Sequence, residues 1–274
     1  MKQKGFFDEN DRLAELSIKG DPLEKLNRHI RWENFRGILT RTLKKEAEGP
    51  GGRPPFDYVM MFKILILQKL YNMADDVTEY QINDRLSFQR FLGLSLCDKV
   101  PDAKTIWHFR EELNEAKILD TVFYRFIEQL EQNGIITHSG SIVDATFVDV
   151  PRQRNTKDEN KDIKEGKTPR EWEKKENKHK KAQKDINARW LTKNKERHYG
   201  YKDHIKIDKK SKIIIKYRVT SAEVHDSQEL KNLIDKNNDR RLYGDSAYTG
   251  EEVQKCIPKT YLTGYMKRDI VIAH

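Results

Sequence analysis

A short apolar segment that carries a carboxylate constrains the fold of this chain more than any other feature. Residues 141–147 are rich in β-branched side chains, follow Gly140 and precede Pro151, a pattern that predicts a buried strand with Asp144 in its middle. Burying a carboxylate is costly unless a cation or a metal compensates its charge. The segment therefore predicts a sheet that carries a charged site.

A second segment of the same kind follows about a hundred residues later. Residues 242–245 predict a short strand that ends at Asp245, and the small residues after it open a turn. Two carboxylates at the ends of neighbouring strands can hold divalent cations, which prefer oxygen ligands. Taken singly, Asp144 also fits a strand-end cap and Asp245 a turn residue, and this alternative stays open.

The first half of the chain has helical spacing of its apolar residues. Asp21-Pro22 marks a helix start, and residues 58–70 are apolar almost all round, which predicts the buried central helix of a helical domain. Thr78 to Gln81 has the spacing of a capping box, and Gly93 is expected to end that helix. No segment approaches the roughly 18 apolar residues of a membrane span.

Residues 102–110 predict a helix with a basic outer face. Asp102 or Thr105 would cap it, and the residues expected to face outward are Lys104 and His108, with Arg110 beside the buried side. A short helix of this kind after a tight connection is typical of a helix-turn-helix that reads DNA. An ordinary small helical bundle has the same pattern, so both interpretations stay open.

From Ile135 the pattern changes to strands. The sequence predicts strands at 141–147, 198–207, 212–220 and 242–245, with helices at 226–235 and 249–256. We therefore expect an α+β chain with a helical domain at 1–134 and a mixed-sheet domain at 135–274. The order of its elements is that of a ribonuclease-H-like nuclease core.

A charged insertion separates the first two of these strands. Residues 152–197 hold 17 Lys and Arg against nine Asp and Glu, which is nearly all of the net charge of +9 that the chain carries. Apolar residues are sparse there, so the segment fits a solvated, partly disordered insertion. It equally fits a flexible basic arm that holds a phosphate backbone beside the carboxylates.

Net charge and cysteine content indicate the class of partner and the cellular location. A basic chain of 274 residues commonly meets nucleic acid, although a solvated basic face gives the same balance. The two cysteines are far apart, which argues against a disulfide framework, and the N-terminus lacks an apolar signal core. A reducing cytoplasmic location fits.

The paired acids suggest phosphodiester chemistry. Two Mg²⁺ ions roughly 3.5–4 Å apart can activate a water or hydroxyl and stabilise the leaving oxygen. Asp144 is the candidate for the bridging ligand and Asp245 for a ligand of one ion. A third acid is normally needed for the second metal.

Several short motifs, in one order between about Gly52 and Gly250, resemble insertion-sequence DDE transposases of the type called insertion sequence five. They are Arg53-Pro54-Pro55-Phe56-Asp57, Asp84-Arg85-Leu86-Ser87-Phe88, Pro101-Asp102 with Thr105-Ile106 and Phe109-Arg110, Val143-Asp144-Ala145-Thr146, His198-Tyr199-Gly200-Tyr201-Lys202, Val224-His225-Asp226-Ser227 and Asp245-Ser246-Ala247-Tyr248. The first and second catalytic Asp of that family fall on Asp144 and Asp245.

The resemblance implies a ribonuclease-H-like core that uses Mg²⁺ to cut the ends of a mobile element and join them to target DNA. The helical domain would recognise terminal inverted repeats, the chain would form a homo-oligomer on DNA, and it would act at the bacterial nucleoid. Lys202 and His204 could contact the strand being cut or be ordinary strand-face residues. His225 is expected in a hydrogen-bonded turn.

The chain departs from this family at its third acid. That acid is expected on a helix well beyond Asp245, whereas Glu251 and Glu252 lie too near Asp245 and Asp269 has the wrong surroundings. The hypothesis is a transposase truncated at its C-terminus, with an incomplete metal site and little activity. The alternatives are an inactive repeat-binding protein that competes with intact transposase, and an unrelated nuclease fold without a DNA partner.

Overall fold

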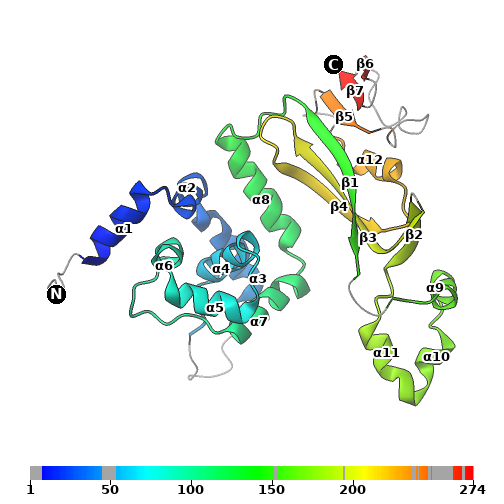
Figure 1. The fold of residues 1–274 in the computed structure, drawn as a ribbon, viewed down its shortest axis with the longest axis horizontal. Coiled ribbons are helices and arrows are strands. Elements are labelled where there is room, and N and C mark those ends of the chain that lie inside the picture. The colour runs from blue at the N-terminus through cyan, green and yellow to red at the C-terminus, as the bar shows by residue number, and fades with distance from the viewer. Residues whose placement is uncertain are drawn as a thin grey trace. The chain divides into compact units, whose positions relative to one another are not determined.

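The chain forms two compact units, residues 1–135 and 136–274. The computed structural model describes residues 8–44, 54–150, 154–193, 195–235, 239, 241–245, 248, 262–266 and 269–273. Helices make up the first unit, and the second contains a mixed sheet with further helices (Figure 1). The expected combination of a helical part and a mixed α and β part is confirmed.

The first unit is built around one apolar helix. Its elements are α1 (Asp8–Ile18), α2 (Pro22–His29), η1 (Trp32–Phe35), α3 (Arg36–Leu43), α4 (Tyr58–Leu70), α5 (Asp75–Asp84), α6 (Leu86–Leu92), α7 (Ala103–Glu115) and α8 (Leu119–Gln132). Asp57 caps α4 by accepting a hydrogen bond from the Met60 amide at 2.9 Å, and Ile64 and Leu67 are fully buried. The central buried helix predicted at 58–70 is therefore confirmed.

The capping box predicted at Thr78 is wrong. Helix α5 begins earlier, at Asp75, and the Thr78 hydroxyl inside it donates a hydrogen bond to the Ala74 carbonyl at 2.7 Å. The predicted single helix up to Gly93 is also two helices, because the backbone of Arg85 is extended and separates α5 from α6. A hydroxyl that bonds back to its own helix has no need of a capping position.

The second unit contains a sheet in which β1 lies between an antiparallel and a parallel neighbour. Its strands are β1 (Ser141–Asp149), β2 (Arg189–Lys193), β3 (Glu196–Asp208), β4 (Ile214–Ser221), β5 (Arg241–Gly244), β6 (Leu262–Met266) and β7 (Asp269–Ala273). The order is β2-β3-β1-β5-β7-β6, with β4 also paired to β3. Strands β1 and β5 are parallel, and the other pairs are antiparallel.

One helix covers the described part of this sheet on the face of Val143. Helix α12 (Asp226–Leu233) packs Leu230 and Leu233 against Val143, Leu242 and Tyr248. His225 caps α12 by accepting from the Ser227 amide at 3.3 Å, so the expected hydrogen-bonded turn is present. The helix predicted at 249–256 lies outside the described residues.

The insertion after β1 is folded in this structure. It contains α9 (Lys157–Lys164), α10 (Arg170–Glu173), η2 (Lys175–Asn177), α11 (Lys178–Gln183) and β2. Trp172 is 2% exposed and donates its indole hydrogen to Glu159 at 2.7 Å, and Lys184 donates to the same carboxylate at 2.6 Å. A buried tryptophan with a paired carboxylate gives this segment a small core, which neither sequence interpretation anticipated.

In the described ranges, none of the helices has the length and apolar character that a bilayer crossing requires.

We expect Gly200→Ala to destabilise the second unit. Gly200 pairs with Asp149 of β1, and a Cβ added to it would lie 2.1 Å from the carbonyl oxygen of Val148. Relief requires β1 and β3 to separate locally, which should lower the free energy of unfolding by about 1–3 kcal/mol or more. Urea unfolding followed by tryptophan fluorescence measures this loss.

Gly37→Ala is the matched control, because an added Cβ on that exposed residue of α3 has open space around it. It should be neutral or slightly stabilising. An unfolding midpoint of Gly200→Ala equal to that of the unchanged chain would show that the two strands do not approach this closely.

Candidate functional site

Asp144 lies within β1, and Asp245 directly follows β5, the strand parallel to it. In the β1 and β5 register Ser141 is opposite Leu242 and Ile142 is opposite Tyr243, so two residues further the register sets Asp144 opposite Asp245. Residues opposite each other in neighbouring strands point to the same face of a sheet. Both aspartates are exposed, on the face opposite to the one that Val143 presents to α12.

The charges of these two carboxylates affect the pKa of the buried Tyr248. The ring packs on Gly244, where an added Cβ would meet the Tyr248 ring at 3.0 Å and Val143 at 3.1 Å. Burial, together with the nearby carboxylates of Asp226, Asp144 and Asp245, raises the pKa of Tyr248. Its hydroxyl is buried and has no hydrogen-bond partner in the described part of the chain. The carboxylates of Asp144 and Asp245 therefore act on one buried group, as expected of neighbours.

The pair has the donor chemistry for a divalent cation but does not complete a two-metal site by itself. One oxygen of Asp144 accepts a hydrogen bond from the Ala145 amide at 2.8 Å, which orients the carboxylate. Oxygen ligands of this kind suit Mg²⁺, which keeps several waters when few carboxylates hold it. Within the residues that the structure describes, no three acidic, histidine or cysteine side chains cluster to hold a metal.

The sequence offers other acids for this role. Glu251 and Glu252 lie outside the described residues, and so does the side chain of Asp269. Asp203, which the sequence analysis did not single out, shares a sheet face with Asp144 because it pairs with Thr146. Burial raises the pKa of Asp203, and its Oδ1 lacks a described partner.

Two buried lysines fix β3 to the elements that lead into β5. Lys202 donates to Asp226 at 2.8 Å and to the carbonyl of Val224 at 2.6 Å, which fastens the start of α12. Lys206 donates to both oxygens of Asp239 at 3.0 and 2.9 Å. Lys206 is buried between the half-buried Ile205 and Ile207, the opposite of what hydrophobicity predicts.

Lys202 and His204, predicted to contact DNA, are therefore buried beneath α12. His204 is fully buried and its Nε2 lies 2.8 Å from the Thr220 hydroxyl, and burial lowers its pKa. The described contacts of both residues are structural, and DNA contact by either one stays a prediction.

In the first unit, the candidate DNA-binding residues of α7 differ in their exposure and contacts. Asp102, one of the two predicted caps, accepts a hydrogen bond from the Thr105 amide at 2.7 Å, and Lys104 and His108 are exposed. Arg110 instead pairs with Asp75 of α5, so its described role is to join two helices. Residues 93–102 connect α6 to α7, a longer connection than the three or four residues of a helix-turn-helix.

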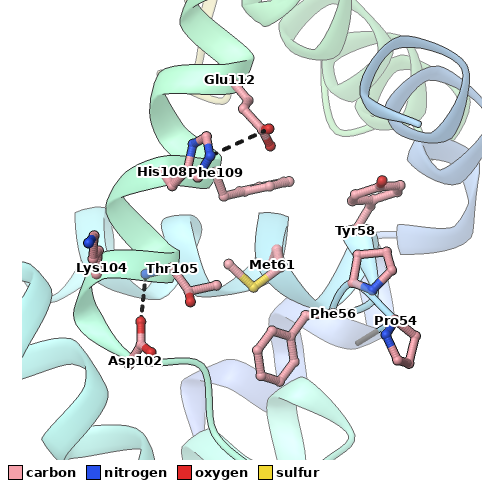
Figure 2. Close-up of a pocket in the computed structure, with 11 residues that line it drawn as sticks. Pro54, Phe56, Tyr58, Met61, Asp102, Lys104, Thr105, His108, Phe109 and Glu112 are labelled. Carbon is pink, nitrogen blue, oxygen red and sulfur yellow. Dashed lines mark hydrogen bonds and ion pairs between the residues drawn. The ribbon is translucent and has the colours of Figure 1, made fainter. Parts of the chain in front are cut away.

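A groove of about 400 Å³ runs beside the exposed side of α7 (Figure 2). Lys104, Thr105 and His108 line it from α7, and Figure 2 shows Pro54, Phe56 and Tyr58 on its other side. The His108 Nε2 lies 3.9 Å from a carboxylate oxygen of Glu112. Lys104 and His108 thus belong to one accessible surface, and Arg110 does not line it.

Two family models match the chain, and they divide it much as the structure does. Residues 11–112 match the family described as Transposase domain (DUF772), and residues 136–268 match the family described as Transposase DDE domain. No solved structure matches the chain.

We expect Lys206→Met to destabilise the second unit strongly. Without the ammonium group, the buried Asp239 carboxylate keeps its hydrogen bonds from Ser141 at 2.8 Å and from the Asp235 amide at 2.7 Å but loses its described cation. Breaking a buried pair in this way costs about 3–5 kcal/mol of unfolding free energy. Urea unfolding provides the measurement.

Lys210→Met is the control, because Lys210 is exposed in the turn between β3 and β4 and the change in charge and shape is the same. It should change the unfolding free energy by less than about 0.5 kcal/mol. Equal effects of the two substitutions would contradict the role given to Lys206.

Proposed function

Because both parts of the chain match transposase domains, we propose that it is the DNA transposase of an insertion sequence, of the type called insertion sequence five. It cuts DNA at the ends of a mobile element and joins the 3′ hydroxyls to target DNA. The motifs around Asp144, Gly200 and Asp245 support the narrower assignment.

The observation that carries this proposal is the parallel register of β1 and β5, whose continuation by two residues would bring Asp144 beside Asp245. Asp144 and Asp245 would hold Mg²⁺, with Asp144 as the ligand shared between ions and Asp245 as a ligand of one ion. Held there, the metal would supply a lower pKa for a water or hydroxyl nucleophile and charge stabilisation for the leaving oxygen. The strand order β4, β3, β1, β5 supports a ribonuclease-H-like core.

Recognition of the element's terminal repeats belongs to the first unit in this proposal. Lys104 and His108 on α7, beside the exposed Trp107, give a basic and aromatic surface of the kind that contacts phosphates and base edges. Two ends must be held together during strand transfer, so the chain acts as a homo-oligomer on DNA.

A second candidate function is repeat binding without cleavage. It is favoured by the number of candidate ligands, because no group of three acidic, histidine or cysteine side chains that could hold a metal is present among the described residues. Such a protein would compete with an intact transposase for the same repeats.

Asp144→Asn and Asp245→Asn should each abolish metal-dependent cleavage and leave DNA binding nearly unchanged. The metal supplies several kcal/mol of transition-state stabilisation, so we expect the cleavage rate to fall by roughly 100-fold or more. The substrate is duplex DNA taken from both sides of the coding sequence. Cleavage is followed on gels with Mg²⁺, with Mn²⁺ and with a chelator, and binding by mobility shift.

Asp149→Asn is the control, because this exposed carboxylate lies on the same strand but not beside Asp245. It should cleave at the rate of the unchanged chain. Binding without cleavage under every metal condition would favour the second candidate, and cleavage that survives Asp144→Asn would remove Asp144 from the proposed site.

A further inference from the structure

The folded insertion contains a basic pocket of about 430 Å³ that the site at Asp144 does not use. One wall is α9 with the residues before it, and the other is formed by Arg189 and Trp190 of β2 and Arg197 of β3. A cavity of this size can take a group as large as one nucleotide.

Cations outnumber acids on the pocket wall. Lys157, Lys161, Lys164, Arg189 and Arg197 line it, against the single carboxylate of Asp158. Lys164 and Arg189 both approach Glu223, the latter at 3.7 Å. No ion pair joins Lys157, Lys161 or Arg197 to another residue that the structure describes. The unpaired cations give the pocket an excess of positive charge that suits a phosphate group.

Asn160 supplies a different kind of evidence. Asn160 is one of the residues that line the pocket, it is 7% exposed, and neither its buried amide nitrogen nor its buried amide oxygen has a hydrogen-bond partner in the described part of the chain. Leaving a buried carboxamide unpaired is costly, so such a group calls for an explanation. A carboxamide offers a donor and an acceptor side by side, which is the pattern that pairs with the edge of a nucleobase.

An aromatic wall completes the pocket. The Trp190 indole donates to the carbonyl of Asn155 at 2.9 Å and its ring packs on Tyr199, with ring centroids 4.9 Å apart. The guanidinium groups of Arg154 and Arg197 lie 5.7 and 5.2 Å from the Trp190 ring centroid. Aromatic rings flanked by arginine are a common surface for unpaired bases.

We propose that this pocket binds one nucleotide of an unpaired DNA strand. Lys157 and Lys161 hold the phosphate, the carboxamide of Asn160 pairs with the edge of the base, and Trp190 forms the wall beside it. The proposal rests on the proposed function, since it assumes that the chain acts on DNA. It gives the charged insertion a specific role in holding a strand that has left the duplex.

Asn160→Leu in the full chain separates this role from a structural one. Leucine has a similar size and no polar atoms, so removing the unpaired carboxamide should leave the midpoint of thermal unfolding unchanged or raise it. Binding of a fluorescein-labelled single-stranded oligonucleotide, measured by anisotropy, should weaken about tenfold because a bidentate contact to a base is lost. Asn160→Ala is measured beside it in case leucine does not fit.

Asn187→Leu is the matched control, because Asn187 is exposed in the same insertion and does not line the pocket. It should bind the oligonucleotide as the unchanged chain does. An abasic oligonucleotide of equal length and charge tests the base contact itself: the difference between Asn160→Leu and the unchanged chain should disappear on it.

Lys161→Ala tests the phosphate contact. It should weaken binding to both oligonucleotides and reduce the slope of log affinity against log salt by about 0.7, the value for one contact to a single strand. Lys210→Ala, an exposed lysine of the same unit outside the pocket, should change the slope by less.

The outcomes distinguish this inference from the proposed function. If the unchanged chain binds DNA and both Asn160 variants bind it equally well, the pocket assignment is wrong and the proposed function stands. The same assignment is overturned if the Asn160 effect persists on the abasic strand. If the unchanged chain binds neither single-stranded nor duplex DNA, both proposals are overturned.

Discussion

The second unit depends on two buried ion pairs under α12. Lys202 and Lys206 point from β3 into the interior, where Asp226 and Asp239 meet them. A buried ion pair seldom adds net stability compared with apolar residues, but its loss is costly, so it enforces one arrangement over others. Asp226 opens α12 and Asp239 precedes β5, so the pairs determine where the helix and the strand lie against the sheet.

That arrangement also determines the geometry of the candidate site. Asp245 directly follows a four-residue strand that shares only two register pairs with β1, too few to hold a carboxylate in place alone. The pair of Lys206 with Asp239 holds the chain just before that strand, and Tyr248 packs on Gly244 just after it. Two like charges beside each other repel, so the support on both sides keeps Asp144 and Asp245 adjacent.

The sequence predicted the elements that a single short stretch of residues specifies by itself. The central helix at 58–70 followed from unbroken apolarity, the cap of α7 from Asp102 as one of two candidates, and strands β1 and β5 from two short apolar segments. The burial of Lys202, His204 and Lys206 could not be predicted, because the carboxylates that compensate the lysines lie 24 and 33 residues away in the chain. The fold of the insertion could not be predicted from its composition for a similar reason. Trp172 and its partner Glu159 form a small core inside a charged segment.

The position of the insertion indicates what its positive charge does. Strand β1 runs from Asp144 directly toward the insertion, and β3 returns from it while paired with β1 along all nine residues of that strand. Exposed aspartates repel a phosphate backbone, and a cation-rich segment in the same unit offsets that repulsion. A disordered arm would lose conformational entropy when it binds a DNA strand. A folded pocket has already lost that entropy on folding, so binding is less costly. Folding within the insertion therefore favours a defined contact with one nucleotide over diffuse attraction to the backbone.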